Sequence, residues 1–219
     1  MKLEKLRNYR KYSRWVDGIF SKNPILIGGL ALPFAVMITN NLKSSVSVSI
    51  LLACSLIPTV LLASLVGKYL PEWGAMMVYT MFSMALVIAS IPLILPISPE
   101  VVDSLGIYIP IIAINTIMLS LCSRYAKDTR KPVMALVDAV TYSIGFALVM
   151  CIVAFVRELF GNNTIWGVPA SLPFKISGLQ IAFAGFIIVA FLSALLRFIK
   201  RTALLVFYRH YNPSPEVRL

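Results

Sequence analysis

The sequence has few charged side chains and a single histidine. Only 13% of its 219 residues are charged, whereas about a quarter are charged in an ordinary soluble domain. His210 is the one histidine, and it lies in a basic tail where we expect it to be solvated. Because histidines do not cluster, the sequence indicates no zinc or haem site.

Cysteines are few and lack the spacing of a metal or redox motif. Cys54, Cys122 and Cys151 are far apart in the chain, and no Cys-x-x-Cys pair occurs. We therefore expect each of them to be a small buried packing residue.

The motifs of soluble catalysis are missing as well. The sequence has no Walker-type phosphate loop, no nucleophile elbow and no paired catalytic carboxylates. Most acids fall in predicted loops or termini, where a carboxylate is simply solvated: Glu72, Glu100, Asp103, Asp128 and Glu216. These absences exclude a hydrolase or a phosphoryl-transfer enzyme of the soluble type.

Apolar sequence is what the chain has in abundance. Hydrophobic residues make up 59% of it, and its mean hydropathy is +0.86. Apolar runs of about 20 residues can cross the roughly 30 Å of a bilayer's hydrocarbon. The sequence therefore predicts an all-α polytopic membrane protein with six transmembrane helices, near 24–40, 46–66, 74–97, 104–122, 132–156 and 178–199.

The distribution of basic residues predicts the orientation of these spans. With the N-terminus inside, all but three of the 20 Lys and Arg fall in inner segments, and the three are Lys43, Arg157 and Lys175. The positive-inside rule then places both termini on the cytoplasmic side of the inner membrane. The net charge of +11 reflects this topology and requires no nucleic-acid partner.

The chain before the first span has the pattern of a surface helix. Apolar residues recur at helical spacing among basic ones over 1–22, which predicts an amphipathic helix in the cytoplasmic interface. No small-x-small cleavage site follows it, so we expect this segment to be retained. The predicted organisation is an interfacial helix over 1–22, a transmembrane domain over 23–200 and a cytoplasmic basic tail over 201–219.

Two of the predicted spans are short and interrupted. The first and the fourth, 24–40 and 104–122, contain glycine, proline and asparagine at matching places in the two halves of the chain. Three spans per half put the second half upside down relative to the first, as in an inverted 3+3 repeat. Because broken backbone in a bilayer must be buried in protein or line a cavity, we expect a functional site where the two breaks meet.

Asp138 is the acid well inside a predicted span. A carboxylate inside a membrane is a candidate for an ion path. Alternatively, Asp138 lies just under the cytoplasmic interface and pairs with a basic loop residue such as Arg130 or Lys131. The sequence leaves both interpretations open.

Other polar residues in the spans have simpler interpretations. Asn115 lies in the middle of the fourth span, where its amide can satisfy a freed backbone group or face a cofactor; we favour the structural hydrogen bond. Arg157 and Glu158 end the fifth span at the outer face, and we expect a local pair or an interface anchor.

The order of several motifs over about residues 20–167 resembles the Rnf/Nqr family, in particular its six-span Rnf E and Nqr D type subunits. The motifs are Asn23-Pro24, the segment 105–110 with Asn115, Asp138 with Gly145-Phe146, and the segment 157–164. The resemblance implies an integral membrane subunit of an ion-coupled electron-transfer complex. It also implies two kinds of partner: a homologous six-span subunit of opposite topology, and flavoproteins among the other subunits.

The resemblance further implies a [2Fe–2S] cluster at the pseudo-symmetry axis, held by two cysteines from each of the two paired subunits. At the corresponding positions this chain has Leu32 before Pro33, and Thr116 after Asn115. Leucine cannot ligate iron, and threonine is a poor substitute for a thiolate. We therefore expect these four residues to mark the cofactor site of the family with its usual ligands absent.

Several outcomes are compatible with this substitution. Cys122 is six residues beyond Thr116, about 9 Å along a helix, so relocated ligation would require a rebuilt site. A different cofactor, ligation by the partner alone, and the absence of a redox centre are the other possibilities. As an alternative function, the chain is a non-redox membrane scaffold or transporter component that keeps the inverted-repeat fold.

Overall fold

The computed structural model describes residues 23–97, 99, 102–103, 106, 108–127, 132–170, 173 and 175–211. The predicted interfacial helix over 1–22 and the last residues of the predicted tail lie outside this part of the chain. Within it, five helices are long and apolar enough to cross a membrane: Leu42–Tyr69, Trp73–Ile94, Tyr108–Lys127, Pro132–Asn162 and Ala182–Thr202. The prediction of a helical, multi-pass membrane protein is confirmed.

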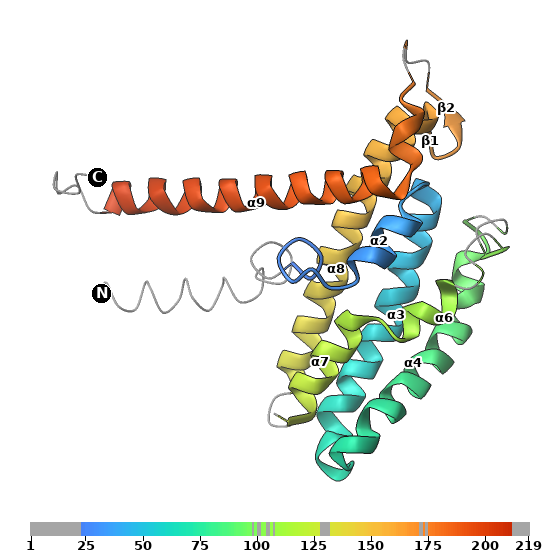
Figure 1. The fold of residues 1–219 in the computed structure, drawn as a ribbon. Coiled ribbons are helices and arrows are strands. Elements are labelled where there is room, and N and C mark those ends of the chain that lie inside the picture. The colour runs from blue at the N-terminus through green and yellow to red at the C-terminus, as the bar shows by residue number, and fades with distance from the viewer. Residues whose placement is uncertain are drawn as a thin grey trace.

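Two helices form the centre of the bundle. α3 (Leu42–Val66) and α8 (Pro132–Arg157) pack along each other, and 56% of the apolar window of each is buried. Both run the length of the bundle in Figure 1. In the predicted repeat they are the middle spans of the two halves, so the halves meet along their equivalent helices.

The sequence of α3 shows how such close packing is reached. Its buried face is rich in serine, and small side chains let helix backbones approach closely in a membrane. Some of the hydroxyls bond back to the carbonyl one turn earlier: Ser49 to Ser45 at 2.7 Å and Thr59 to Ser55 at 2.6 Å. These bonds supply partners for polar groups that water does not reach.

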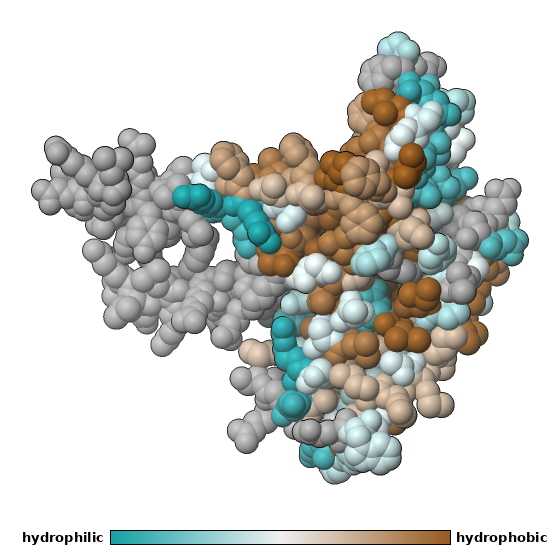
Figure 2. All heavy atoms as spheres, in the orientation of Figure 1, coloured by the Kyte–Doolittle hydropathy of each residue, from teal (hydrophilic) through white to brown (hydrophobic). Residues whose placement is uncertain are grey.

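α4 (Glu72–Ile94) completes the first half of the bundle. It follows the 3₁₀ turn η2 (Gly67–Tyr69) and packs beside α3. On the face drawn in Figure 2, hydrophobic residues cover much of the described bundle, as expected for helices that face lipid.

The first predicted span is not a helix of spanning length. After a turn over 24–28 the chain forms only α2 (Leu32–Ile38), and a helix of seven residues is about 10 Å long. Gly29 and Ala31 have φ angles of 62° and 55°, so the backbone leaves helical geometry between these two pieces. The expectation of an interrupted first segment is confirmed.

The fourth predicted span is broken in a milder way. α6 (Tyr108–Ala113) and α7 (Thr116–Lys127) are separated by Ile114 and Asn115. The two pieces together still form a segment long enough to cross the membrane.

The C-terminal end of α8 continues into a compact connection. The π-helical turn η3 (Glu158–Asn162) leads to a hairpin of β1 (Thr164–Ile165) and β2 (Val168–Pro169), and the 3₁₀ turn η4 (Ser177–Gln180) follows. In the hairpin, Thr164 pairs with Pro169 and Ile165 with Val168. Both loop residues between these strands, Trp166 and Gly167, have positive φ, as a type I′ turn requires.

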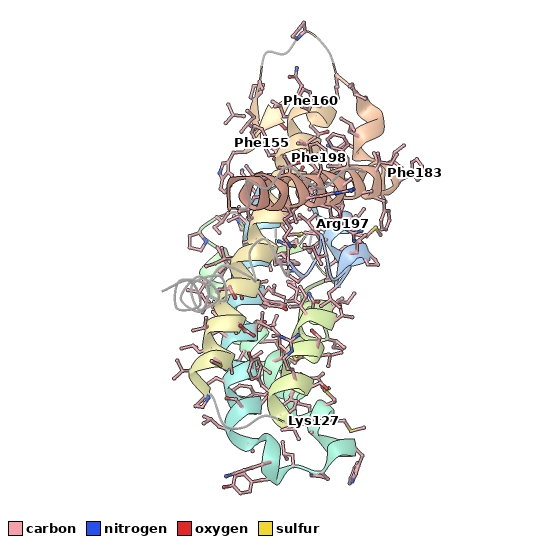
Figure 3. All side chains as sticks on the ribbon, turned by 90° about the vertical axis from the view of Figure 1, so that its left-hand side faces the viewer. Lys127, Phe155, Phe160, Phe183, Arg197 and Phe198 are labelled. Carbon is pink, nitrogen blue, oxygen red and sulfur yellow. The ribbon has the colours of Figure 1, made fainter. Side chains whose placement is uncertain are left out.

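α9 (Ala182–Tyr211) is the element whose placement the sequence did not predict. It lies across the other long helices in Figure 1 rather than beside α8, and only 11% of its apolar window is buried. Phe183, which is 71% exposed, points away from the bundle in Figure 3. The helix also continues past residue 200, so the predicted boundary between transmembrane domain and tail is not a break in structure.

The close approach of Gly67, after the end of α3, to α7 generates a stability prediction. A Cβ at Gly67 would lie 2.6 Å from the Cα of Ala126 in α7. We expect Gly67→Ala to lower the free energy of unfolding by about 1–3 kcal/mol, because overpacking forces the backbones apart. Gly178→Ala is the matched control, since no atom lies within 4 Å of that Cβ. Thermal unfolding of the two variants in detergent micelles compares them, and equal midpoints would contradict the close approach.

Candidate functional site

The first break begins at a buried asparagine. The Asn23 side chain accepts hydrogen bonds from the backbone N–H groups of Ile25 and Leu26, both at 3.0 Å, through Oδ1. Its Nδ2 donates to the carbonyl of Gly145 in α8 at 3.0 Å. Asn23 therefore satisfies two amides that have no helical partner and attaches the start of the broken segment to the centre of the bundle.

The second break also depends on an asparagine. Asn115 is 5% exposed, and its Oδ1 accepts a hydrogen bond from the N–H of Ile117 at 3.0 Å at the start of α7. This is the N-cap geometry that asparagine favours. The predicted structural hydrogen bond of Asn115 is confirmed, while its buried Nδ2 has no hydrogen-bond partner among the described residues.

The two breaks meet directly. The backbone N–H of Ala31 donates a hydrogen bond to Thr116 Oγ1 at 2.8 Å, across 85 residues of sequence. Ala31 has the left-handed conformation that ends the turn before α2, so its amide has no helical acceptor. A hydroxyl from the second half of the chain thus provides the hydrogen-bond acceptor for an amide at the first break.

A cavity of about 450 Å³ lies where the breaks meet. Three of the four predicted site residues, Pro33, Asn115 and Thr116, are in its lining. Leu32 is not; it packs partly buried against the core beside the cavity. The rest of the lining is almost entirely apolar and comes from both broken segments: Gly29, Leu30, Ala31, Met37, Tyr108, Ile111 and Ile114.

The lining does not have the donor set of an iron–sulfur cluster. It contains no cysteine, histidine or acid, and no three such residues come together anywhere in the described part of the chain. Cys122 is fully buried on α7, with its thiol directed to the Met118 sulfur at 3.6 Å. Cys54 and Cys151 are half-buried on α3 and α8. The residues present therefore do not fit the family's cluster.

Asp138 lies away from this lining, in the N-terminal part of α8. The Tyr125 hydroxyl of α7 donates a hydrogen bond to Asp138 Oδ2, and Arg124 Nη1 lies 3.7 Å from the same oxygen. The carboxylate thus has a basic partner, Arg124, near the predicted cytoplasmic end of the bundle. Arg130 and Lys131, the two partners that the sequence suggested, lie outside the described residues. Its role in an ion path stays a prediction.

Arg157 and Glu158 differ from the expected local pair or interface anchor. They are 1% and 3% exposed, and the hydrogen bonds of each run to other segments of the chain. The sequence signal that was available is their adjacency in an otherwise apolar region, since buried charges need specific partners. The identity of those partners depends on the fold, because they are distant in the chain.

Comparisons with known proteins identify the family to which the chain is similar. Residues 12–198 match the family described as "Rnf-Nqr subunit, membrane protein". A Shewanella pealeana protein, named as the D subunit of a Na(+)-translocating NADH-quinone reductase, is 27% identical over 153 residues, which cover 70% of this chain and 72% of that protein. The protein of the same name from Shewanella woodyi is 26% identical over 164 residues, covering 74% and 78%. The family match includes both breaks, the cavity and the two buried charges.

The contact between the breaks can be tested by removing one hydroxyl. We expect Thr116→Val to lower the free energy of unfolding by about 1 kcal/mol, because the Ala31 amide loses its acceptor. Thr116→Ser keeps a hydroxyl and should retain most of the stability. Chemical unfolding in micelles measures both variants, and equal losses would mean that the hydroxyl does not satisfy this amide.

Proposed function

This chain belongs to the Rnf-Nqr membrane subunit family, and we propose that it is an integral subunit of an ion-coupled electron-transfer complex. Relatives with this subunit's pattern carry the name of a Na(+)-translocating NADH-quinone reductase. The observation that carries the proposal is the contact between the two broken segments, Ala31 N–H to Thr116 Oγ1, beside the cavity. That juxtaposition is what a midplane site in an inverted repeat requires.

We propose that a homologous subunit of opposite topology packs against this cavity. Apolar side chains at its rim are open to the outside: Met37 is 49%, Ile111 42% and Ile114 60% exposed. A second set of broken helices would cover them and enclose the axis between the two subunits. Flavoprotein subunits of the same complex would carry flavins on the outer side and pass electrons along a path from a cytoplasmic donor.

The chain's own part in electron transfer is structural in this proposal. Iron would need thiolate ligands at about 2.3 Å, the distance typical of metal–thiolate bonds. Neither Leu32 nor Thr116 can supply one, and Cys122 is directed to Met118 instead. The chain therefore shapes one wall of the axis site and contributes no ligand to a cluster there.

The cysteines provide the decisive experiment. We expect a Cys54→Ala, Cys122→Ala, Cys151→Ala triple variant, purified with its partners, to retain the flavin and iron–sulfur spectra of the native complex. Visible and electron paramagnetic resonance spectra and donor-driven electron transfer are the measurements. The Cys54→Ala, Cys151→Ala double variant, which keeps Cys122, is the matched control.

Two results would overturn the proposal at different points. A [2Fe–2S] signal that disappears only when Cys122 is replaced would show that this chain ligates the cluster after all. If the tagged wild-type chain copurifies with no flavoprotein and no redox signal, the complex itself is the wrong assignment. A non-redox scaffold or transporter would then be the better description.

The orientation in the membrane is proposed from the charges at the two ends of the bundle. Lys127 and Phe160 lie at opposite ends in Figure 3, and Lys68 and Arg124 belong to the segments near the Lys127 end. The positive-inside rule makes that end cytoplasmic and the β1–β2 hairpin external, with both chain termini inside.

Thiol labelling tests this orientation. In the cysteine-free variant, we expect Val168→Cys to react with a membrane-impermeant maleimide added to intact cells, because Val168 is 65% exposed in the hairpin. Lys68→Cys, at the other end of the bundle, should react only after the cells are opened. The reverse pattern would invert the topology.

A further inference from the structure

We propose that Arg157 and Glu158 are positioning residues, which fix the outer end of the first broken segment and thereby hold its break against Thr116. The inference goes beyond the proposed function, because it concerns the geometry of the axis whether or not electrons pass there. It rests on the hydrogen bonds that these two buried charges make.

All three nitrogens of the Arg157 guanidinium group donate hydrogen bonds, and the acceptors lie at the ends of two short helices. Nη1 donates to the Val36 carbonyl at 2.6 Å and to Thr39 Oγ1 at 2.8 Å, at the end of α2. On the other side, three carbonyls around the end of η4 accept from Nε and Nη2: Leu179 at 3.0 Å, Gln180 at 2.9 Å and Ile181 at 3.4 Å. The last carbonyls of a helix lack helical partners, and a cation there is favourable.

Glu158 does the opposite at the start of α3. Its Oε2 accepts a hydrogen bond from the Leu42 N–H at 2.6 Å, and Asn41 makes no side-chain cap there. Its Oε1 accepts from Gly167 N–H at 2.9 Å and from the Thr164 hydroxyl at 3.3 Å, which ties the β1–β2 hairpin to the same point. An acid at a helix N-terminus complements the free amides and the helix dipole.

Because consecutive helical residues point about 100° apart, the two side chains reach different elements. Arg157 fixes the end of α2 and Glu158 the beginning of α3, so the short connection between these helices is held from both sides. Burying either charge without its partners would be strongly unfavourable. The hydrogen bonds therefore define one position for this connection.

α8 holds the first broken segment at a second point. Asn23 bonds to Gly145, twelve residues before Arg157 and about 18 Å along the helix. Between the two attachments lie the break and α2, whose seven residues form one short rigid unit with Pro33 in its first turn. A shift of the Val36 end would therefore move Ala31 relative to Thr116.

α9 closes this arrangement from outside. A Cβ at Gly185 would lie 3.2 Å from Arg157 Nη1 and 2.7 Å from the Val36 side chain, so the helix passes directly over the guanidinium. Further along, Ser193 Oγ donates to the Leu26 carbonyl at 2.6 Å. α9 thus contacts both pieces of the first broken segment and shields the buried charge.

Cross-linking between the two breaks tests the positioning role without an activity assay. Both cysteine pairs are introduced into the triple Cys→Ala variant, which has no other cysteine. Cross-linking of the axis pair, Ala31→Cys with Thr116→Cys, measures how closely the two breaks approach. The reference pair, Tyr125→Cys with Asp138→Cys, measures the α7–α8 contact far from the breaks. A short bifunctional thiol reagent is applied to both. We expect Arg157→Gln to slow cross-linking of the axis pair at least tenfold and to change the reference pair by less than twofold.

Milder variants keep the test decisive if Arg157→Gln does not fold. Arg157→Lys and Thr39→Val remove only some of the bonds to the end of α2, and each should slow the axis pair about two- to fivefold. Thr164→Val, which removes a bond of Glu158 to the hairpin alone, is the matched control and should leave the rate unchanged. Folded Arg157→Lys and Thr39→Val proteins with wild-type axis rates, or equal slowing of both pairs, would overturn the inference.

Discussion

Backbone amides released from a helix inside a membrane must find partners in the protein, because lipid offers none. The rest of this structure depends on that constraint. Asn23 and Asn115 each satisfy amides at the start of a helical segment, and the Thr116 hydroxyl takes the amide of Ala31 from the other half of the chain. Since one break is completed by a residue of the other, the two halves cannot be placed independently, and a cavity lies between them.

The same requirement applies where α8 meets the β1–β2 hairpin, but there the groups that need partners are charged side chains. Arg157 and Glu158 lie side by side in sequence but end on backbone groups of different helices. Together with the hydrogen bond from Asn23 to Gly145, these bonds attach the first broken segment to α8 at both of its ends. Burying either ion alone would be unfavourable. Here each ion lies at a helix end whose dipole and free backbone groups have the opposite partial charge, so its burial is stabilised.

The contacts that hold the two breaks in this chain need no metal ligand. Asparagine amides, buried charges and close packing of α3 on α8 hold the breaks in position, and none of these contacts uses a thiolate. At the position where the family resemblance implies a second cysteine, Thr116 is a hydrogen-bond acceptor for Ala31. The apolar cavity between the breaks is therefore held open by contacts within the described chain.

By itself the sequence determined the membrane class, the approximate bounds of five long helices, the location of both breaks and the importance of Asn115, because hydropathy and backbone-breaking residues are local signals. It could not place Leu32 beside the cavity rather than in it, nor assign partners to Asp138 beyond its neighbours in the chain. Only the tertiary structure decided that Arg157 and Glu158 are buried against different helix ends, that the first span shrinks to a seven-residue helix, and that α9 crosses the bundle. Those outcomes depend on which distant carbonyls, amides and helix faces contact one another. Contacts between residues so far apart produce no periodic pattern in a single sequence, so the sequence could not predict them.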